Sequence, residues 1–266
     1  MLTALDTSPT GASTDSDPRS MVARICAILA AFRPADRALS IAEIARRAEL
    51  PTSTVSRIVH DLVSSRMLER DGRRVRPGIR LFEFGEAADR PHQLRRASLT
   101  PMRNLRDILG LTVHLAMLEH DEVLYIEVLR ARKDGYSALP SRVARMPAHA
   151  TAVGKALLAW STQEVVDRVV GEPLRPLGPR TITRPARLLE ELRATRREGF
   201  AIERGESRTG VTCIAVPVLD AAGAPVVALS VMGRDPDVVP ALVVPALRAA
   251  GEDLRRQLDR VPRLSA

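Results

Sequence analysis

Two short segments on either side of Pro51 carry apolar residues at helical spacing. In the first, Ser40 and Glu43 stand three residues apart, which is the spacing at which two side chains cap the first turn of a helix. Pro51 disfavours helical geometry in the residue before it and so separates the segments. The apolar face of the second segment consists of Val55, Ile58, Val59 and Leu62. The pattern predicts two short helices joined by a tight turn.

The outward face of the second predicted helix carries short hydroxyl side chains, one guanidinium group and one imidazole. Small polar residues at the start of a helix let it enter the major groove of DNA, where Ser, Thr and Arg reach phosphates and base edges. An ordinary helical hairpin with a solvated polar face has the same pattern, so this face alone leaves both interpretations open. The candidate DNA-binding residues of the helix are Thr52, Ser53, Thr54, Ser56, Arg57 and His60.

The segment that follows favours DNA binding. Residues 68–76 begin like a strand, turn at Asp71-Gly72 and return through basic residues, which predicts a β-hairpin. Residues 20–80 contain 12 Arg and 6 acidic residues, a surplus of six positive charges in a chain whose net charge is +8. Charge concentrated in this way is typical of a phosphate-binding surface. The prediction is a winged helix-turn-helix that binds double-stranded DNA, with Arg73, Arg74 and Arg76 on the wing.

Composition sets wider bounds on the protein. A chain of 266 residues that is 45% hydrophobic is long enough for two modest domains. No run of 18 apolar residues occurs, so no membrane-spanning helix is expected. Residues 1–19 are rich in Ser, Thr, Asp and Gly and are expected to form a disordered leader. Cys26 and Cys213 form no metal-binding or redox spacing, so we expect a cytoplasmic protein with reduced thiols, without a metal or cofactor.

Helical periodicity also predicts elements on both sides of the helix-turn-helix. A helix with one apolar face is expected at 21–32, and two more at 79–88 and 93–109, separated at Arg90-Pro91. The last of these carries an apolar stripe that offers a surface for self-association. The stripe consists of Leu94, Leu99, Met102, Leu105 and Leu109.

From residue 111 onward, strand-like and helical segments alternate. Expected strands are 112–118, 123–129, 200–203, 211–219 and 225–232, and expected helices are 151–160, 163–169, 185–198 and 238–258. Antiparallel strands with helices on one or both faces predict an α+β sensor domain. The expected domains are a winged helix-turn-helix at 20–82, linker and dimerisation helices at 83–110 and the α+β domain at 111–262.

Four sequence segments make the chain resemble the IclR-type bacterial transcriptional regulators over residues 20–260. The segments are LPTSTVSR (50–57), GIRL (78–81), PAHATAVGKALLA (147–159) and GVTCIAVPV (210–218). The resemblance implies a winged helix-turn-helix joined to a GAF-like effector domain, assembly as homodimers or tetramers, and binding of small organic acids or aromatic metabolites. The chain departs from the family pattern at Glu49 and Pro77, where Gly and Leu are usual, and at Ala144, where Gly is frequent.

The resemblance also implies which residues line the effector pocket. In the family, the helix that opens with this His-Ala-Thr-Ala segment meets a ligand carboxylate with its backbone N–H groups, which here belong to Ala152 and Val153. Glu203 stands where an acidic side chain often binds a ligand hydroxyl or hydrate. Met232 replaces a Ser found in some members and so favours a less polar ligand. The remaining pocket residues are Met146, Val211, Cys213 and Ser230.

Two functions therefore stand at this point. The favoured one is a ligand-responsive DNA-binding regulator whose effector is a small carboxylate, with no catalytic residue. The alternative is a GAF-like hydrolase that uses Cys213 and His149, with the N-terminal domain docking on nucleic acid. Plain structural roles are also open: a structural His149, an ion-paired Lys155, a solvated Glu203 and a core Cys213.

Overall fold

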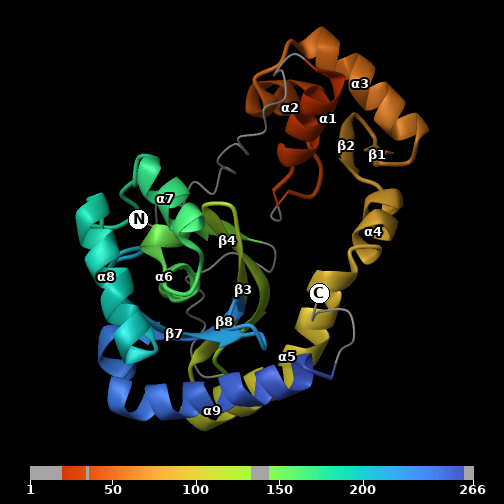
Figure 1. The fold of residues 1–266 in the computed structure, drawn as a ribbon. Coiled ribbons are helices and arrows are strands. Elements are labelled where there is room, and N and C mark those ends of the chain that lie inside the picture. Colours follow the sequence, from red (N-terminus) through yellow and green to blue (C-terminus); the bar gives the residue numbers. More distant parts are fainter. Residues whose placement is uncertain (1–19, 34–35, 133–143, 261–266) are drawn as a thin grey trace. The chain divides into compact units, whose positions relative to one another are not determined.

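The computed structural model describes residues 20–33, 36–132 and 144–260, and the chain divides into two compact units between Asp89 and Arg90 (Figure 1). Each unit has its own hydrophobic core. The leader expected at residues 1–19 lies outside the described residues. Within the described part of the chain, no helix combines the length and the apolar character needed to cross a membrane.

The first unit is a three-helix core with a small β-hairpin, as the sequence predicts. Its elements are α1 (Met21–Ala30), α2 (Ile41–Ala48), α3 (Thr52–Ser64), β1 (Leu68–Asp71), β2 (Arg74–Pro77) and α4 (Ile79–Glu86). The predicted stripe of α3 is buried and packs with Ile28, Ile44 and Val75. Because Asp71 pairs with Arg74, the hairpin turn consists of Gly72 and Arg73. Gly72 takes a φ of 59°, a left-handed conformation that glycine adopts without steric cost.

Two local features define the helix-turn-helix. At the start of α2, the Ser40 N–H donates to Glu43 Oε2 at 2.8 Å and the Glu43 N–H donates to Ser40 Oγ at 3.2 Å, which confirms the predicted capping box. At its end, Glu49 has φ 53° and ψ 40°, in the left-handed region. A side chain there brings its Cβ close to the backbone, at a cost of about 1–2 kcal/mol.

The second unit is a six-stranded antiparallel sheet with helices on both faces (Figure 1). The strands run in the order β5-β4-β3-β8-β7-β6. They are β3 (Thr112–Glu119), β4 (Glu122–Leu129), β5 (Arg145–Pro147), β6 (Ala201–Arg204), β7 (Val211–Leu219) and β8 (Pro225–Arg234). One face is covered by α5 (Asp89–Leu109) and α9 (Pro240–Leu258), and the other by α6 (Ala152–Leu158), α7 (Gln163–Gly171) and α8 (Pro185–Glu198). The predicted α+β class is confirmed.

Alternate residues of the central strands contact different helices, because successive side chains of a strand point to opposite faces. On β8, Leu229 and Val231 join the core beneath α5 and α9, whereas Ala228 and Met232 join the core beneath α6. We call the side of the sheet that meets α6 the α6 face. Gly154 of α6 lies against the backbone of the turn that precedes the helix: a Cβ there would lie 2.1 Å from the Ala148 carbonyl oxygen.

The boundary between α4 and α5 differs from the expected one. The sequence predicts a break at Arg90-Pro91, but the two helices are separated by Ala87 and Ala88. Pro91 is the third residue of α5, where the backbone N–H has no acceptor within the helix, so proline is tolerated there.

Four of the five residues of the apolar α5 stripe pack in the core of their own unit, and Leu99 is half-buried; a role of the stripe in self-association stays a prediction. Leu94, Met102 and Leu105 are buried in the core that α5 forms with the sheet of its own unit. Leu109 packs against the same core. The periodicity of the stripe correctly indicates a buried helix face, but it carries no information about which surface covers that face.

Glu49→Gly is expected to stabilise the first unit by about 0.5–1 kcal/mol. Glycine removes the steric cost of the left-handed conformation, and part of that gain is offset by the greater freedom of glycine in the unfolded chain. Urea unfolding followed by far-UV circular dichroism measures the change in the free energy of unfolding. Glu49→Ala is the matched control, since it removes the carboxylate and keeps the Cβ; equal effects of the two substitutions would contradict the assignment.

Candidate functional site

The outward residues of α3 form a polar surface beside the wing. Five of the six predicted side chains are exposed and Thr54 is half-buried. Pro51 is the N-cap of α3 and supplies no side-chain hydrogen bond to the first turn, so the N–H groups of that turn are not capped by it. Arg57 makes no hydrogen bond or ion pair with any described residue. The surface therefore combines uncapped backbone donors, small hydroxyls and an unengaged guanidinium group, all of which suit phosphates and base edges.

The three wing arginines differ in their surroundings. Arg73 lies in the hairpin turn, is exposed and has no partner among the described residues. Arg74 donates to the Ala38 carbonyl oxygen at 3.1 Å, and Arg76 donates twice to Glu69 Oε2, at 3.2 and 3.0 Å. Arg73 is thus the wing arginine that is most available to a phosphate.

The predicted effector residues come together on the α6 face. Backbone pairing places Glu203 on β6 opposite Cys213 on β7, and Cys213 opposite Met232 on β8. Directly paired residues point to the same side of a sheet, so these three side chains form one row. Ser230 lies one pair further along β8 on the same side. The other predicted effector residues belong to the hydrophobic core on this face, and they are Met146, Ala152, Val153 and Val211.

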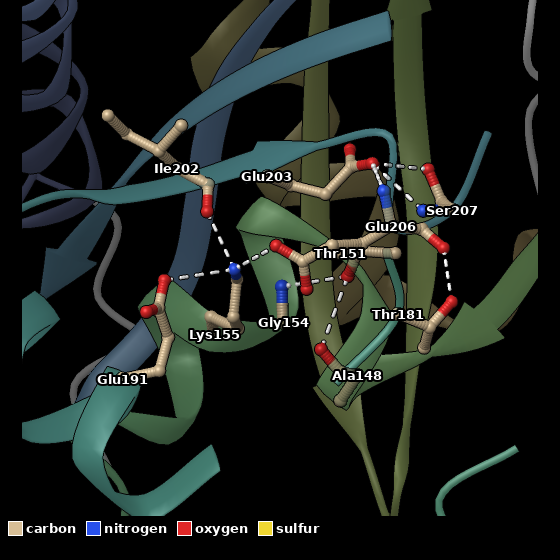
Figure 2. Close-up of polar contacts among 10 residues, drawn as sticks. All are labelled: Ala148, Thr151, Gly154, Lys155, Thr181, Glu191, Ile202, Glu203, Glu206 and Ser207. Atoms are coloured by element: carbon tan, nitrogen blue, oxygen red, sulfur yellow. Dashed lines mark hydrogen bonds and ion pairs between the residues drawn. The ribbon is translucent and has the colours of Figure 1, made fainter. Parts of the chain in front are cut away.

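Glu203 is a buried carboxyl group, not a solvated one. It is 2% exposed, and its Oε1 accepts hydrogen bonds from the N–H of Glu206 at 3.0 Å and from the N–H of Ser207 at 2.9 Å (Figure 2). The Ser207 hydroxyl donates to the same oxygen at 3.0 Å. Burial raises the pKa of Glu203 to about 7, so both charge states are accessible near neutral pH.

Lys155 is an ion-paired structural residue. Its ammonium group is fully buried and donates to Glu206 Oε1 at 2.6 Å, to the Ile202 carbonyl oxygen at 2.6 Å and to Glu191 Oε1 at 3.1 Å (Figure 2). These three acceptors occupy the donor capacity of an ammonium group. Helix α6, helix α8 and the end of β6 are tied together at this point.

The first turn of α6 is the site expected for a ligand carboxylate. Thr151 is the N-cap, and its Oγ1 accepts from the Gly154 N–H at 3.1 Å (Figure 2). The N–H groups of Ala152 and Val153 precede the first intrahelical bond and are not served by this cap. Because α6 has seven residues, its dipole is small and the two N–H groups themselves are the main attraction for an anion.

Cys213 and His149 do not form a nucleophile–base pair. Burial raises the pKa of the Cys213 thiol to about 12, and its side-chain hydrogen bond is with Ser230. His149 Nε2 lies 3.0 Å from the Arg175 carbonyl oxygen, to which it donates. Among the described residues, no hydrogen bond joins Cys213 to His149. A thiol with this pKa stays protonated at neutral pH, which disfavours nucleophilic catalysis.

Sequence reasoning missed two residues of the α6 face. His114 on β3 pairs with Ser230, and its Nδ1 lies 3.2 Å from Ser230 Oγ. Tyr125 on β4 meets the His114 ring edge-on, with 5.5 Å between ring centroids. The sequence offered one signal for His114: a histidine within an apolar strand, at an alternating position that shares a face with Thr112 and Ala116.

Comparison with known proteins covers both units. Residues 87–256 match the family described as bacterial transcriptional regulator IclR C-terminal, and residues 21–72 match the IclR helix-turn-helix domain. The HTH-type transcriptional regulator KdgR of Dickeya chrysanthemi is 31% identical over 219 residues, which cover 81% of this chain and 71% of KdgR. The Pca regulon regulatory protein of Pseudomonas putida is 30% identical over 249 residues, 92% of this chain and 86% of that protein.

Solved structures agree with these matches. An IclR homolog complexed with 4-hydroxybenzoate, from Microbacterium hydrocarbonoxydans, has a TM-score of 0.82 and 34% sequence identity, over 90% of this chain and 99% of that one. One family thus accounts for the helix-turn-helix unit and for the sheet unit alike, and this chain belongs to the IclR-type bacterial transcriptional regulators.

Proposed function

We propose that this regulator responds to a small carboxylic acid with an apolar or aromatic body, bound on the α6 face. The observation that carries the proposal is the row formed by Glu203, Cys213 and Met232 beside the first turn of α6. The turn offers N–H donors for an anion, and Met232 with Met146 and Val211 offers apolar contact for a ring. The relative from Microbacterium hydrocarbonoxydans, which is complexed with 4-hydroxybenzoate, supports this class of ligand.

In this proposal, the first unit binds operator DNA through α3 and the wing. Thr52, Ser53, Thr54, Ser56, Arg57 and His60 face the major groove, and Arg73, Arg74 and Arg76 approach the phosphates. Ligand binding changes DNA affinity by the coupling free energy between the two sites, and operator binding changes ligand affinity by the same factor.

Arg57→Ala is expected to cost about 1–3 kcal/mol of binding free energy on the cognate operator and to relax sequence preference, because Arg57 is exposed, unengaged and on the outward face of α3.

Arg73→Ala should weaken binding to all duplexes alike and reduce the slope of log affinity against log salt by about 1. Fluorescence anisotropy with operator and scrambled duplexes at several salt concentrations measures both effects.

Arg76→Ala is the matched control on the same hairpin. Its guanidinium group is already engaged by Glu69, so it should weaken binding less than Arg73→Ala does. Wild-type affinity in both the Arg57 and the Arg73 variants would remove the proposed DNA-binding surface.

The functional unit is proposed to be a homodimer or a tetramer of this chain. One winged helix contacts too little DNA for selective binding, and a two-fold axis duplicates the contact. The exposed large apolar side chains of the first unit lie on α1 and α4, and they are Met21, Val22, Ile79, Phe82 and Phe84. Such exposed side chains are typical of an association surface.

Phe82→Asp is expected to shift the chain toward monomer, because Phe82 is 62% exposed and a carboxylate there opposes burial against a second copy. Sedimentation equilibrium at micromolar concentration measures the change. Arg187→Asp on the exposed surface of α8 is the control. A wild-type protein that remains monomeric, with and without operator DNA, would contradict the proposed assembly.

Met232→Ser is expected to weaken binding of 4-hydroxybenzoate about tenfold, since burying a methionine side chain contributes about 1.5–3 kcal/mol and serine leaves part of that contact unmade. The DNA affinity of the ligand-free protein should stay the same. Calorimetry with the acid and anisotropy with operator DNA measure the two quantities.

Met117→Ser is the matched control for this experiment. Met117 is as buried as Met232, at 7% against 6% exposed, but it lies in the core on the opposite face of the sheet. The control should lose stability and keep its ligand affinity. Equal losses of affinity in the two variants would place the ligand away from the α6 face.

A further inference from the structure

We propose that His114 is a ligand-binding residue of the α6 face and that its Nε2 takes a hydrogen bond with a neutral hydroxyl group of the effector. This inference rests on the proposed effector function of the same face and extends it to a class of ligand, a hydroxylated acid. It also assigns a specificity-determining role to a residue that the family resemblance did not indicate.

The position of His114 places it inside the candidate site. On β3 it pairs with Ser230 of β8 on one side and with Val128 of β4 on the other. Ser230 in turn stands next to the row of Cys213 and Met232. The His114 side chain therefore shares the α6 face with the expected effector residues.

One nitrogen of the His114 ring has a partner and the other has none. Nδ1 lies 3.2 Å from Ser230 Oγ, whereas Nε2 is buried without a hydrogen-bond partner among the described residues. The residue is 1% exposed, so the nitrogen is not satisfied by open solvent. A buried polar atom left unpaired costs about 1–3 kcal/mol, and such atoms are uncommon enough to call for a partner that arrives from outside the chain.

The surroundings of His114 select a neutral partner. Burial lowers the pKa of His114 to about 3, so the ring is uncharged at neutral pH. Its neighbours are the Ser230 hydroxyl and the edge-on ring of Tyr125, and the Cys213 thiol beyond Ser230 is also protonated. None of these three neighbours is positively charged, so none would compensate the charge of a ligand carboxylate buried beside His114. An anionic end of the ligand is therefore better placed at the backbone donors of α6.

A hydroxyl group satisfies the unpaired nitrogen whichever proton arrangement the ring adopts. If Ser230 donates to Nδ1, Nε2 carries the proton and donates to the ligand oxygen. If Nδ1 donates to Ser230, Nε2 accepts a hydrogen bond from the ligand hydroxyl. A hydroxyl both donates and accepts, so it fits both tautomers, whereas a hydrogen atom at the same place on the ligand leaves Nε2 unpaired.

The test is a comparison of matched acids on matched variants of the full chain. Calorimetry with 4-hydroxybenzoate, 3-hydroxybenzoate and benzoate is carried out on wild type, His114→Phe and His114→Gln. Wild type should bind one of the hydroxybenzoates about tenfold more tightly than benzoate. His114→Phe keeps an aromatic ring beside Tyr125 and removes both nitrogens, so this variant should bind the hydroxybenzoate and benzoate with about equal affinity. His114→Gln places an amide near the position of Nε2 and should restore part of the preference.

The possible outcomes separate this inference from the proposed function. If wild type binds none of the three acids, the proposed effector class fails and the inference fails with it. If wild type binds them but shows no hydroxyl preference, or if His114→Phe keeps the preference, the role of His114 is overturned while the effector class stands. Should His114→Phe not fold, ¹⁵N NMR of the wild-type histidine rings decides: Nε2 of His114 should shift with a hydroxybenzoate and not with benzoate, and equal spectra would overturn the proposal.

Discussion

One buried ammonium group holds together the parts of the second unit that carry the candidate site. Lys155 on α6 binds Glu191 of α8, the Ile202 carbonyl of β6 and Glu206 after β6. Removing such charges from water costs several kcal/mol per ion, and only close partners in fixed geometry offset that cost. The position of Glu206 is therefore tightly set. Its N–H, with that of Ser207, holds Glu203 on the α6 face, so the ion pair of Lys155 helps to fix the position of the candidate ligand-binding carboxyl.

Features that depend on neighbouring residues were predictable from the sequence. The capping box of Ser40 and Glu43, the buried stripe of α3 and the hairpin after it follow from interactions across three to nine positions. The change from helical to alternating patterns near residue 111 indicated the α+β unit in the same way. These signals identified the outward residues of α3, because an amphipathic helix fixes its exposed face once its buried face is known.

Features that depend on strand pairing were not predictable. His114 meets Ser230 across 116 residues, and Lys155 meets Glu206 across 51. The first contact requires the register of β3 and β8, and the second requires α6 to pack beside β6; no single segment encodes either. The stripe of α5 shows the same limit: its periodicity gave the buried face, and only the assembled sheet showed what buries it. The family resemblance supplied Glu203 and Cys213 where periodicity could not.

Strand β3 contributes side chains to both cores of the second unit, one on each face of the sheet. His114 faces the α6 side, while the adjacent Leu115 packs in the core that contains Leu94, Met102 and Leu105 of α5. Protein cores are close-packed and barely compressible, so β3 has little freedom to move on one side alone. A ligand that displaced β3 on the α6 side would therefore also displace side chains that pack against α5, and only Ala87 and Ala88 separate α5 from α4, the last helix of the first unit.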